Sequence, residues 1–144
     1  MTEETLVIRP LTSPEDMALV EDLQRAVWTG NETEVVPAHM LLAVAHAGGV
    51  VLGAFEADRL VGMVYGFLGV DSAHPERLAM ARLKHCSHML AVHPAARNRS
   101  IGFRLKLAQR EAVVRRLYLR DAYGQMRDGL NAGLASDRFD VEWW

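Results

Sequence analysis

The stretch His88–Leu105, HMLAVHPAARNRSIGFRL, decides the fold because it changes from strand character to helix character within a few residues. Its start belongs to an apolar, β-prone run, HCSHMLAVHP, that begins at His85 and is closed by Pro94. From Ile101 onward, apolar side chains recur at steps of four, three and four residues, which predicts a helix with one buried stripe. The stretch therefore predicts a strand, a tight loop and a helix start in direct succession.

The loop between this strand and this helix is suited to phosphate. The start of a helix offers free backbone N–H groups and the positive end of the helix dipole. Arg97 and Arg99 lie in the loop, where guanidinium groups can bind a diphosphate, and Gly102 allows a ligand to approach the first turn closely. In a simpler interpretation, both arginines only face solvent and the glycine only eases the turn. Spacing alone leaves both interpretations open.

Composition limits the classes of protein that the chain can be. Its 144 residues are 50% hydrophobic and 24% charged, which is typical of one globular domain spanning residues 1–144. The net charge of -2 gives the whole molecule no affinity for nucleic acid or for an anionic membrane. The one cysteine, Cys86, excludes an internal disulfide, and Met1–Pro10 lacks the apolar core of a signal peptide. We therefore expect a cytoplasmic domain.

Hydrophobic spacing and turn residues predict the remaining elements. The predicted helices are Pro14–Trp28, capped by Ser13, and a helix that starts at Pro37 and ends at Gly48–Gly49. The other predicted strands are Leu6–Arg9, Val50–Glu56, Leu60–Val70 and the half-buried stretch Phe139–Trp143. The order β-α-α-β-β-β-α-β indicates an α/β chain of the α+β type with a central antiparallel hairpin, and not a doubly wound fold.

The quoted stretch resembles the acetyl-CoA-binding segment of the GNAT superfamily of N-acetyltransferases. In that family an apolar-x-Val-x-Pro strand end leads into Arg/Gln-x-x-Gly-x-Gly/Ala and a helix. The matching positions are Leu90, Val92, Pro94, Arg97, Ser100 and Gly102. The preceding elements are also similar in order, so the resemblance covers roughly residues 5–117. It implies a mixed, mostly antiparallel central sheet flanked by helices.

The resemblance also implies a cofactor and a reaction. Acetyl-CoA would be the co-substrate, without a metal, and its acetyl group would pass directly to a primary amine on a small molecule or a protein. The pantetheine arm would pair with the backbone of Leu90, Ala91 and Val92. The pyrophosphate would bind the loop and helix start, which comprise Arg97, Asn98, Arg99, Ser100, Ile101, Gly102 and Phe103.

Three further side chains are candidates for catalysis. His88 precedes the expected acetyl position and can act as a base near neutral pH. Glu34, which lies with Glu32 in the polar loop where the family builds its acceptor site, can attract a cationic amine. Tyr65, in a hairpin strand, can donate a proton. The simpler interpretations are a histidine bonded within the sheet, a solvated carboxylate and a core tyrosine.

The chain departs from the family pattern at two points. Ser100 and Asn98 replace glycines, and if the turn needs a positive φ, Ser100 costs on the order of 1 kcal/mol. A strand and a helix, about thirty residues in all, are lacking around residues 114–118 through a deletion or an omitted segment. With the resemblance, Tyr118–Met126 is predicted to be a strand. Without the resemblance, the sequence predicts one long helix over Phe103–Tyr123.

Other functions remain as alternatives. A degenerate GNAT-like domain can bind CoA weakly or serve as a protein-interaction module without catalysis, and an unfinished sheet can be completed by a partner chain, as in a homodimer. A zinc site at His85, Cys86 and His88 lacks further ligands at suitable spacing. One helix carries cations that favour the 3′-phosphate of CoA over nucleic acid, namely Arg104, Lys106, Arg110, Arg115 and Arg116.

Overall fold

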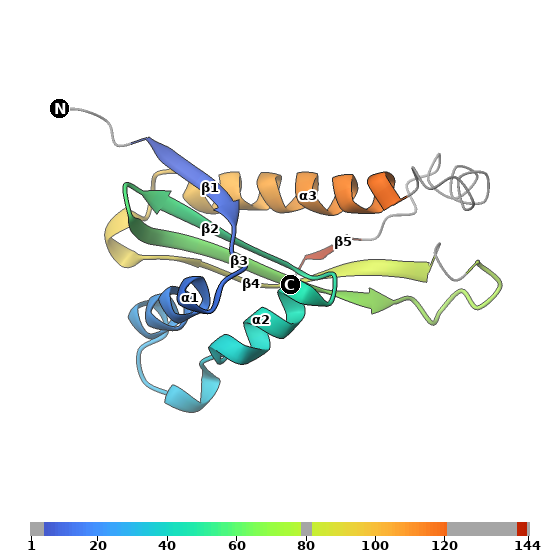
Figure 1. Cartoon of the computed structure of the whole chain (residues 1–144), viewed down its shortest axis with the longest axis horizontal. Helices are drawn as coiled ribbons and strands as arrows, with labels where there is room; N and C mark the ends of the chain where they lie inside the picture. Colours follow the sequence, from blue (N-terminus) through green and yellow to red (C-terminus); the bar gives the residue numbers. More distant parts are fainter. Residues whose placement is uncertain (1–4, 79–81, 121–140, 144) are drawn as a thin grey trace.

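The structure is a computed structural model that describes residues 5–78, 82–120 and 141–143 (Figure 1). The described residues form a five-stranded sheet in the order β1-β2-β3-β4-β5. Its strands are β1 (Leu6–Pro10), β2 (Val50–Glu56), β3 (Arg59–Val70), β4 (Leu83–Val92) and β5 (Val141–Trp143). The helices are α1 (Pro14–Val27), α2 (Ala38–His46) and α3 (Ile101–Arg120), with short 3-10 turns η1 (Glu32–Glu34) and η3 (Pro94–Ala96).

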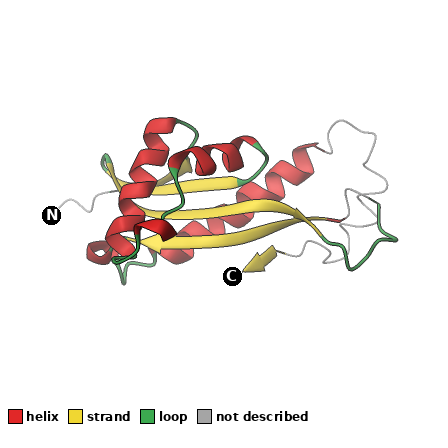
Figure 2. Cartoon of the chain, turned by 90° about the horizontal axis from the view of Figure 1, so that it is seen from below, coloured by secondary structure: helices red, strands yellow, loops and turns green. Residues whose placement is uncertain are grey.

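Helices cover both faces of the sheet. Helices α1 and α2 lie on one face and α3 lies on the other (Figure 1). Figure 2, seen from the side of α1 and α2, shows the strands side by side with β5 at the edge next to β4. Strands β1 to β4 pair antiparallel in chain order, whereas β5 pairs parallel to β4. The α+β fold class and the central hairpin expected from the sequence are confirmed.

Two apolar cores hold these layers together. On the α1 and α2 side, Met17, Leu41 and Met63 are completely buried. On the α3 side, Val61, Val64 and Leu105 are completely buried. Because both faces are covered, all seven residues of β2 are buried, which explains why its sequence is a continuous apolar run and not an alternating one.

The predicted start of α1 is confirmed in detail. Ser13 is the N-cap, and its hydroxyl oxygen accepts a hydrogen bond from the Asp16 N–H at 3.1 Å. Pro14 occupies the first turn, where its missing N–H costs nothing. This cap fixes where the helix begins, and therefore which of its side chains reach the sheet.

The strand predicted at Tyr118–Met126 is wrong over its described part, because α3 continues through Tyr118 to Arg120. Residues 121–126 of that prediction lie outside the described residues, as does Phe139 of the last predicted strand. The helix extends because its interior contains neither proline nor glycine after Gly102, and because Glu111 and Arg115 form an i,i+4 ion pair at 3.1 Å. Its buried stripe, which includes Leu105 and Val113, anchors it to the sheet.

Strand β4 changes its pairing at one residue, His88. On the β3 side, Met89 pairs with Tyr65 but Ser87 pairs with Gly66, so His88 is the extra residue of a β-bulge. On the β5 side, pairing covers His85 to Ser87. Beyond Ser87 the outer edge of β4 has no strand partner among the described residues, and this free edge runs directly into the loop before α3.

We expect the α3 interface to be the main source of stability on its face of the sheet. Replacing fully buried Leu105 with Ala should lower the free energy of unfolding by about 2–5 kcal/mol, because it leaves a cavity between α3 and the sheet. Leu107→Ala, two residues along the same helix and 51% exposed, should change it by less than about 0.5 kcal/mol. Urea unfolding of both variants measures the difference, and equal losses would contradict the packing described above.

Candidate functional site

The loop after β4 is fixed to the end of the sheet. The His93 N–H donates to the Val61 carbonyl at 2.8 Å, and the His93 ring nitrogen Nδ1 accepts from the Ala95 N–H at 3.2 Å. Ala96 is completely buried. The loop therefore leaves the sheet at a defined position, and the residues that follow are presented by a rigid base.

Two residues of the loop have left-handed backbone conformations. Asn98 has φ +64° and Ser100 has φ +57°, so the turn has the positive φ for which the family pattern provides glycine. The Ser100 carbonyl accepts the Arg104 N–H at 3.0 Å, which starts α3 at Ile101. The N–H groups of the first helical residues have no acceptor within the helix and point out of its positive end.

The helix start opens into a hollow of about 590 Å³. It is lined by Thr5, Leu6, Glu56, Arg99, Ser100, Ile101 and Arg104. Arg99 forms an ion pair with the carboxylate of Glu56, which is only 5% exposed at the end of β2. Arg97 is exposed and directs its Nε–H toward the Val92 carbonyl at 3.5 Å. Of the two arginines predicted to bind phosphate, Arg99 is therefore already paired with a buried carboxylate.

The free edge of β4 and the first turn of α3 are in contact. A Cβ built on Gly102 would lie 3.4 Å from a Leu90 methyl group and 3.7 Å from a Val92 methyl group, which are ordinary van der Waals distances. Ile101 is buried in the core beneath, whereas Phe103 is 67% exposed. The end of β4 and the first turn of α3 thus lie next to each other.

His88 and Glu34 meet in a second pocket, on the α1 and α2 face of the sheet. The pocket has a volume of about 290 Å³. Its lining residues are Gln24, Trp28, Asn31, Glu34, Val35, Val36, His88 and Met89. The two candidates come from the η1 turn and from the β4 bulge, which are far apart in sequence, so the bulge aims His88 at the loop that carries Glu34.

The two acids of this loop differ in their partners. Glu32 pairs with Arg25 at 2.8 Å, and this contact lowers the pKa of the Glu32 carboxyl. Glu34 forms no ion pair with any described residue and lines the pocket. The loop itself is held by Gln24, whose side chain accepts from the Val36 N–H at 2.8 Å and donates to the Val36 carbonyl at 3.0 Å.

Gln24 is a residue that the sequence interpretation missed. It is 1% exposed, among the apolar positions of α1. The sequence did contain a signal, because Gln24 follows Leu23 in the buried stripe of α1. A buried amide needs hydrogen-bond partners, so a polar residue at this position indicates a structural contact.

Tyr65 supports the site without entering it. It is 7% exposed and is not among the residues that line the His88 pocket. Burial raises the pKa of its hydroxyl. Its ring meets the His88 ring edge-on at a centroid distance of 5.8 Å, and the Phe67 ring lies 5.8 Å from His88 on another side. These rings form the wall against which the imidazole rests.

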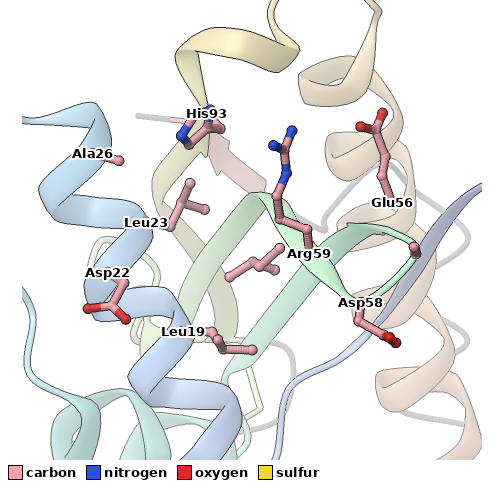
Figure 3. Close-up of a pocket in the computed structure, with 10 residues that line it drawn as sticks. Leu19, Asp22, Leu23, Ala26, Glu56, Asp58, Arg59 and His93 are labelled. Carbon is pink, nitrogen blue, oxygen red and sulfur yellow. The ribbon is translucent and has the colours of Figure 1, made fainter. Parts of the chain in front are cut away.

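A third hollow, of about 790 Å³, lies between α1, the β2–β3 turn and His93 (Figure 3). In Figure 3, Asp22 and Leu19 come from α1, Asp58 comes from the turn, and Arg59 comes from the start of β3. It is a wide, open depression with charges of both signs. None of the predicted site residues lines it.

No three His, Cys, Asp or Glu side chains of residues 5–78, 82–120 and 141–143 are grouped as metal ligands. No helix within these same ranges is long and apolar enough to cross a bilayer.

The chain is similar to solved acetyltransferases. No protein-family model matches the sequence, and no curated protein matches it. An N-acetyltransferase, PaiA, from Thermoplasma acidophilum in complex with coenzyme A has a TM-score of 0.59 at 18% identity, over 78% of this chain and 74% of its own. An aminoglycoside acetyltransferase from an uncultured soil metagenomic sample, in complex with trehalose, has a TM-score of 0.64 at 15% identity, over 100% of this chain and 97% of its own.

A third solved structure carries the family name. It is a GNAT family acetyltransferase from Brucella melitensis in complex with acetyl-CoA, with a TM-score of 0.53 at 21% identity, over 76% of this chain and 71% of its own. At such identities the likeness concerns the fold, and it agrees with the strand–loop–helix motif identified in the sequence. This chain has the fold of the GNAT acetyltransferases.

Proposed function

We propose that the chain is an acetyl-CoA-dependent N-acetyltransferase that acts on a primary amine of a small cationic molecule. The observation that carries this proposal is the free edge of β4 beyond Ser87. This edge leads into a loop in which Asn98 and Ser100 have positive φ, and then into the start of α3. An extended chain ending in a diphosphate fits such a surface, because the edge supplies strand-like hydrogen bonds and the helix start supplies an anion site.

In this proposal the coenzyme follows β4 into the loop. The pantetheine arm pairs with the backbone of Leu90–Val92, and the diphosphate accepts hydrogen bonds from the N–H groups at the start of α3, around Ile101–Phe103. Arg97 adds a charge-assisted contact. Several acetyltransferases of similar fold were solved with coenzyme A or acetyl-CoA, which supports this choice of co-substrate.

The reaction is a direct transfer between two nucleophiles. The acetyl carbonyl accepts a hydrogen bond from a β4 amide near Leu90, which stabilises the negative charge that develops on its oxygen. His88 removes a proton from the amine as its nitrogen attacks the carbonyl carbon, and the C–S bond then breaks. The aromatic wall of Tyr65 and Phe67 holds the imidazole in place for this step.

The His88 pocket suits a small amine with positive charge. Glu34 offers a carboxylate without an ion-pair partner among the described residues, and Trp28, which is 40% exposed, offers an aromatic face for a cation. The proteins of similar fold include three aminoglycoside acetyltransferases, of which one was solved with trehalose and with sisomicin and another with coenzyme A. Aminoglycosides carry several amines. A volume of about 290 Å³ admits one amine-bearing ring more readily than a folded protein surface.

The first prediction concerns the coenzyme. Acetyl-CoA at 100 times its Kd should raise the free energy of unfolding by about 2.7 kcal/mol, measured by thermal unfolding. Arg97→Ala should weaken binding by about tenfold, the loss expected for one charge-assisted contact. Arg59→Ala, which removes an exposed cation at the start of β3, is the control and should bind as the parent does. No shift at millimolar acetyl-CoA would favour an interaction module without catalysis.

The second prediction concerns the strained turn. Ser100→Gly should raise the free energy of unfolding by about 0.5–1 kcal/mol, because relief of about 1–2 kcal/mol at φ +57° outweighs the extra chain entropy of glycine, about 0.4–1 kcal/mol. Asn98→Gly should gain less, since asparagine tolerates this conformation. Urea unfolding compares the two variants, and a destabilised Ser100→Gly protein contradicts the conformation described for this loop.

The third prediction separates acceptor binding from chemistry. With a polyamine or an aminoglycoside as the acceptor, Glu34→Gln should raise KM by about tenfold and leave kcat nearly unchanged, because it removes one ionic contact. His88→Gln should lower kcat by about 10²-fold or more and retain acetyl-CoA binding. Glu32→Gln is the control, since Glu32 is engaged by Arg25. Full activity of the His88 variant would remove it from the role of base.

A further inference from the structure

The interface between β4 and α3 contains a buried polar cluster. His85 is 1% exposed, and Ser87 and Gln109 are completely buried. Gln109 Nε2 lies 2.9 Å from His85 Nε2, and the Ser87 hydroxyl donates to Gln109 Oε1 at 3.0 Å. Lys106 completes the cluster, because its ammonium group donates to the Ser87 hydroxyl oxygen and lies 3.4 Å from Gln109 Oε1.

The surrounding structure is adapted to this cluster. The rest of the α3 interface is apolar, so each buried polar group costs free energy unless it is hydrogen-bonded. Strand β3 provides Gly66 beneath the His85 ring, where an added Cβ would lie only 2.3 Å from His85 Nε2. The Lys106 ammonium group is therefore bonded to Ser87 and Gln109, and Gln109 in turn contacts His85, whose ring lies over Gly66.

The position of the cluster connects it to the proposed reaction. Ser87 is the last β4 residue paired with β5, and the free edge begins at the next residue, His88. If the diphosphate binds at the start of α3, the thioester end of the pantetheine arm lies at the opposite end of the free edge, beside His88. His88 faces the acceptor pocket, whereas Ser87 and Lys106 lie on the α3 side.

The electrostatic setting of Lys106 favours proton donation. Burial lowers the pKa of its ammonium group from the usual lysine value, which makes the proton easier to give up near neutral pH. Among the described side chains, His85 is the other titratable member of the cluster, and it is linked to Lys106 through Gln109. Strands β2 and β3 contribute apolar side chains such as Leu52 and Val64 to the same interface.

We propose that Lys106 is the acid of the transfer reaction and protonates the sulfur of the departing coenzyme. This inference rests on the proposed function. As the amine nitrogen bonds to the acetyl carbon, the C–S bond breaks and its electron pair goes to sulfur. The sulfur takes a proton from the Lys106 ammonium group, which leaves a neutral thiol and a neutral lysine. Lys106 then regains a proton from solvent, which also receives the amine proton released through His88.

The test uses the coenzyme alone, because an ammonium group beside the sulfur should favour the thiolate of free CoA. The Kd values of CoA and of acetyl-CoA, which has no ionisable thiol, are measured by calorimetry from about pH 6 to about pH 9, across the onset of thiol ionisation. In the unmodified protein, CoA should gain about tenfold over acetyl-CoA as pH rises, which corresponds to a thiol pKa lowered by about one unit. Lys106→Met should abolish this gain.

Matched variants separate the outcomes. Lys106→Arg keeps a cation and should retain the gain in binding but lose turnover, because a guanidinium group does not give up its proton. Arg59→Met, which removes an exposed cation at the start of β3, should behave as the parent. Lys106→Gln replaces the methionine variant if that protein does not fold. An equal pH response in the parent and in the Lys106 variants would overturn the role of Lys106 and leave the proposed function intact. Failure of the parent to bind either coenzyme would overturn both.

Discussion

The candidate site depends on one constraint, the loss of regular pairing along β4 at His88. The bulge on the β3 side coincides with the end of the β5 pairing on the other side. Strand β4 is therefore paired on both edges from His85 to Ser87, but only with β3 from Met89 to Val92. Backbone groups at an open edge need partners, which a ligand can supply. The same bulge places His88 at the pocket that Glu34 also lines and leaves Ser87 on the opposite face, so each proposed chemical role derives from a single irregularity in the sheet.

The surrounding structure makes this irregularity rigid. The two apolar cores clamp the strand between α1 and α2 on one side and α3 on the other, and the aromatic rings around His88 restrict its movement. On the α1 side, the hydrogen bonds between Gln24 and the backbone of Val36 fix the loop that carries Glu34. The proposed transfer needs its reacting groups held in place, and the packing of the domain would provide this.

Sequence analysis predicted the parts of the fold that have local signals. The cap at Ser13, the hairpin and the change from strand to helix at His88–Leu105 all follow from spacing and turn residues. The motif even identified Ser100 as a strained position, which its φ of +57° confirms. The extent of α3 was misjudged at Tyr118, because the comparison with the family outweighed the unbroken helical sequence. The site could not be assembled in advance, since Glu34 meets His88, and Lys106 meets Ser87, through a bulge and a helix crossing that leave no local signature.

The ion pair between Arg99 and Glu56 links the loop before α3 to the end of β2. Glu56 is buried at the end of β2, and its ion-pair partner Arg99 belongs to the loop before α3. In the proposed complex, a phosphate at the helix start competes with this carboxylate for Arg99. The end of β2, although remote from the reacting atoms, would then influence how tightly the loop binds its ligand.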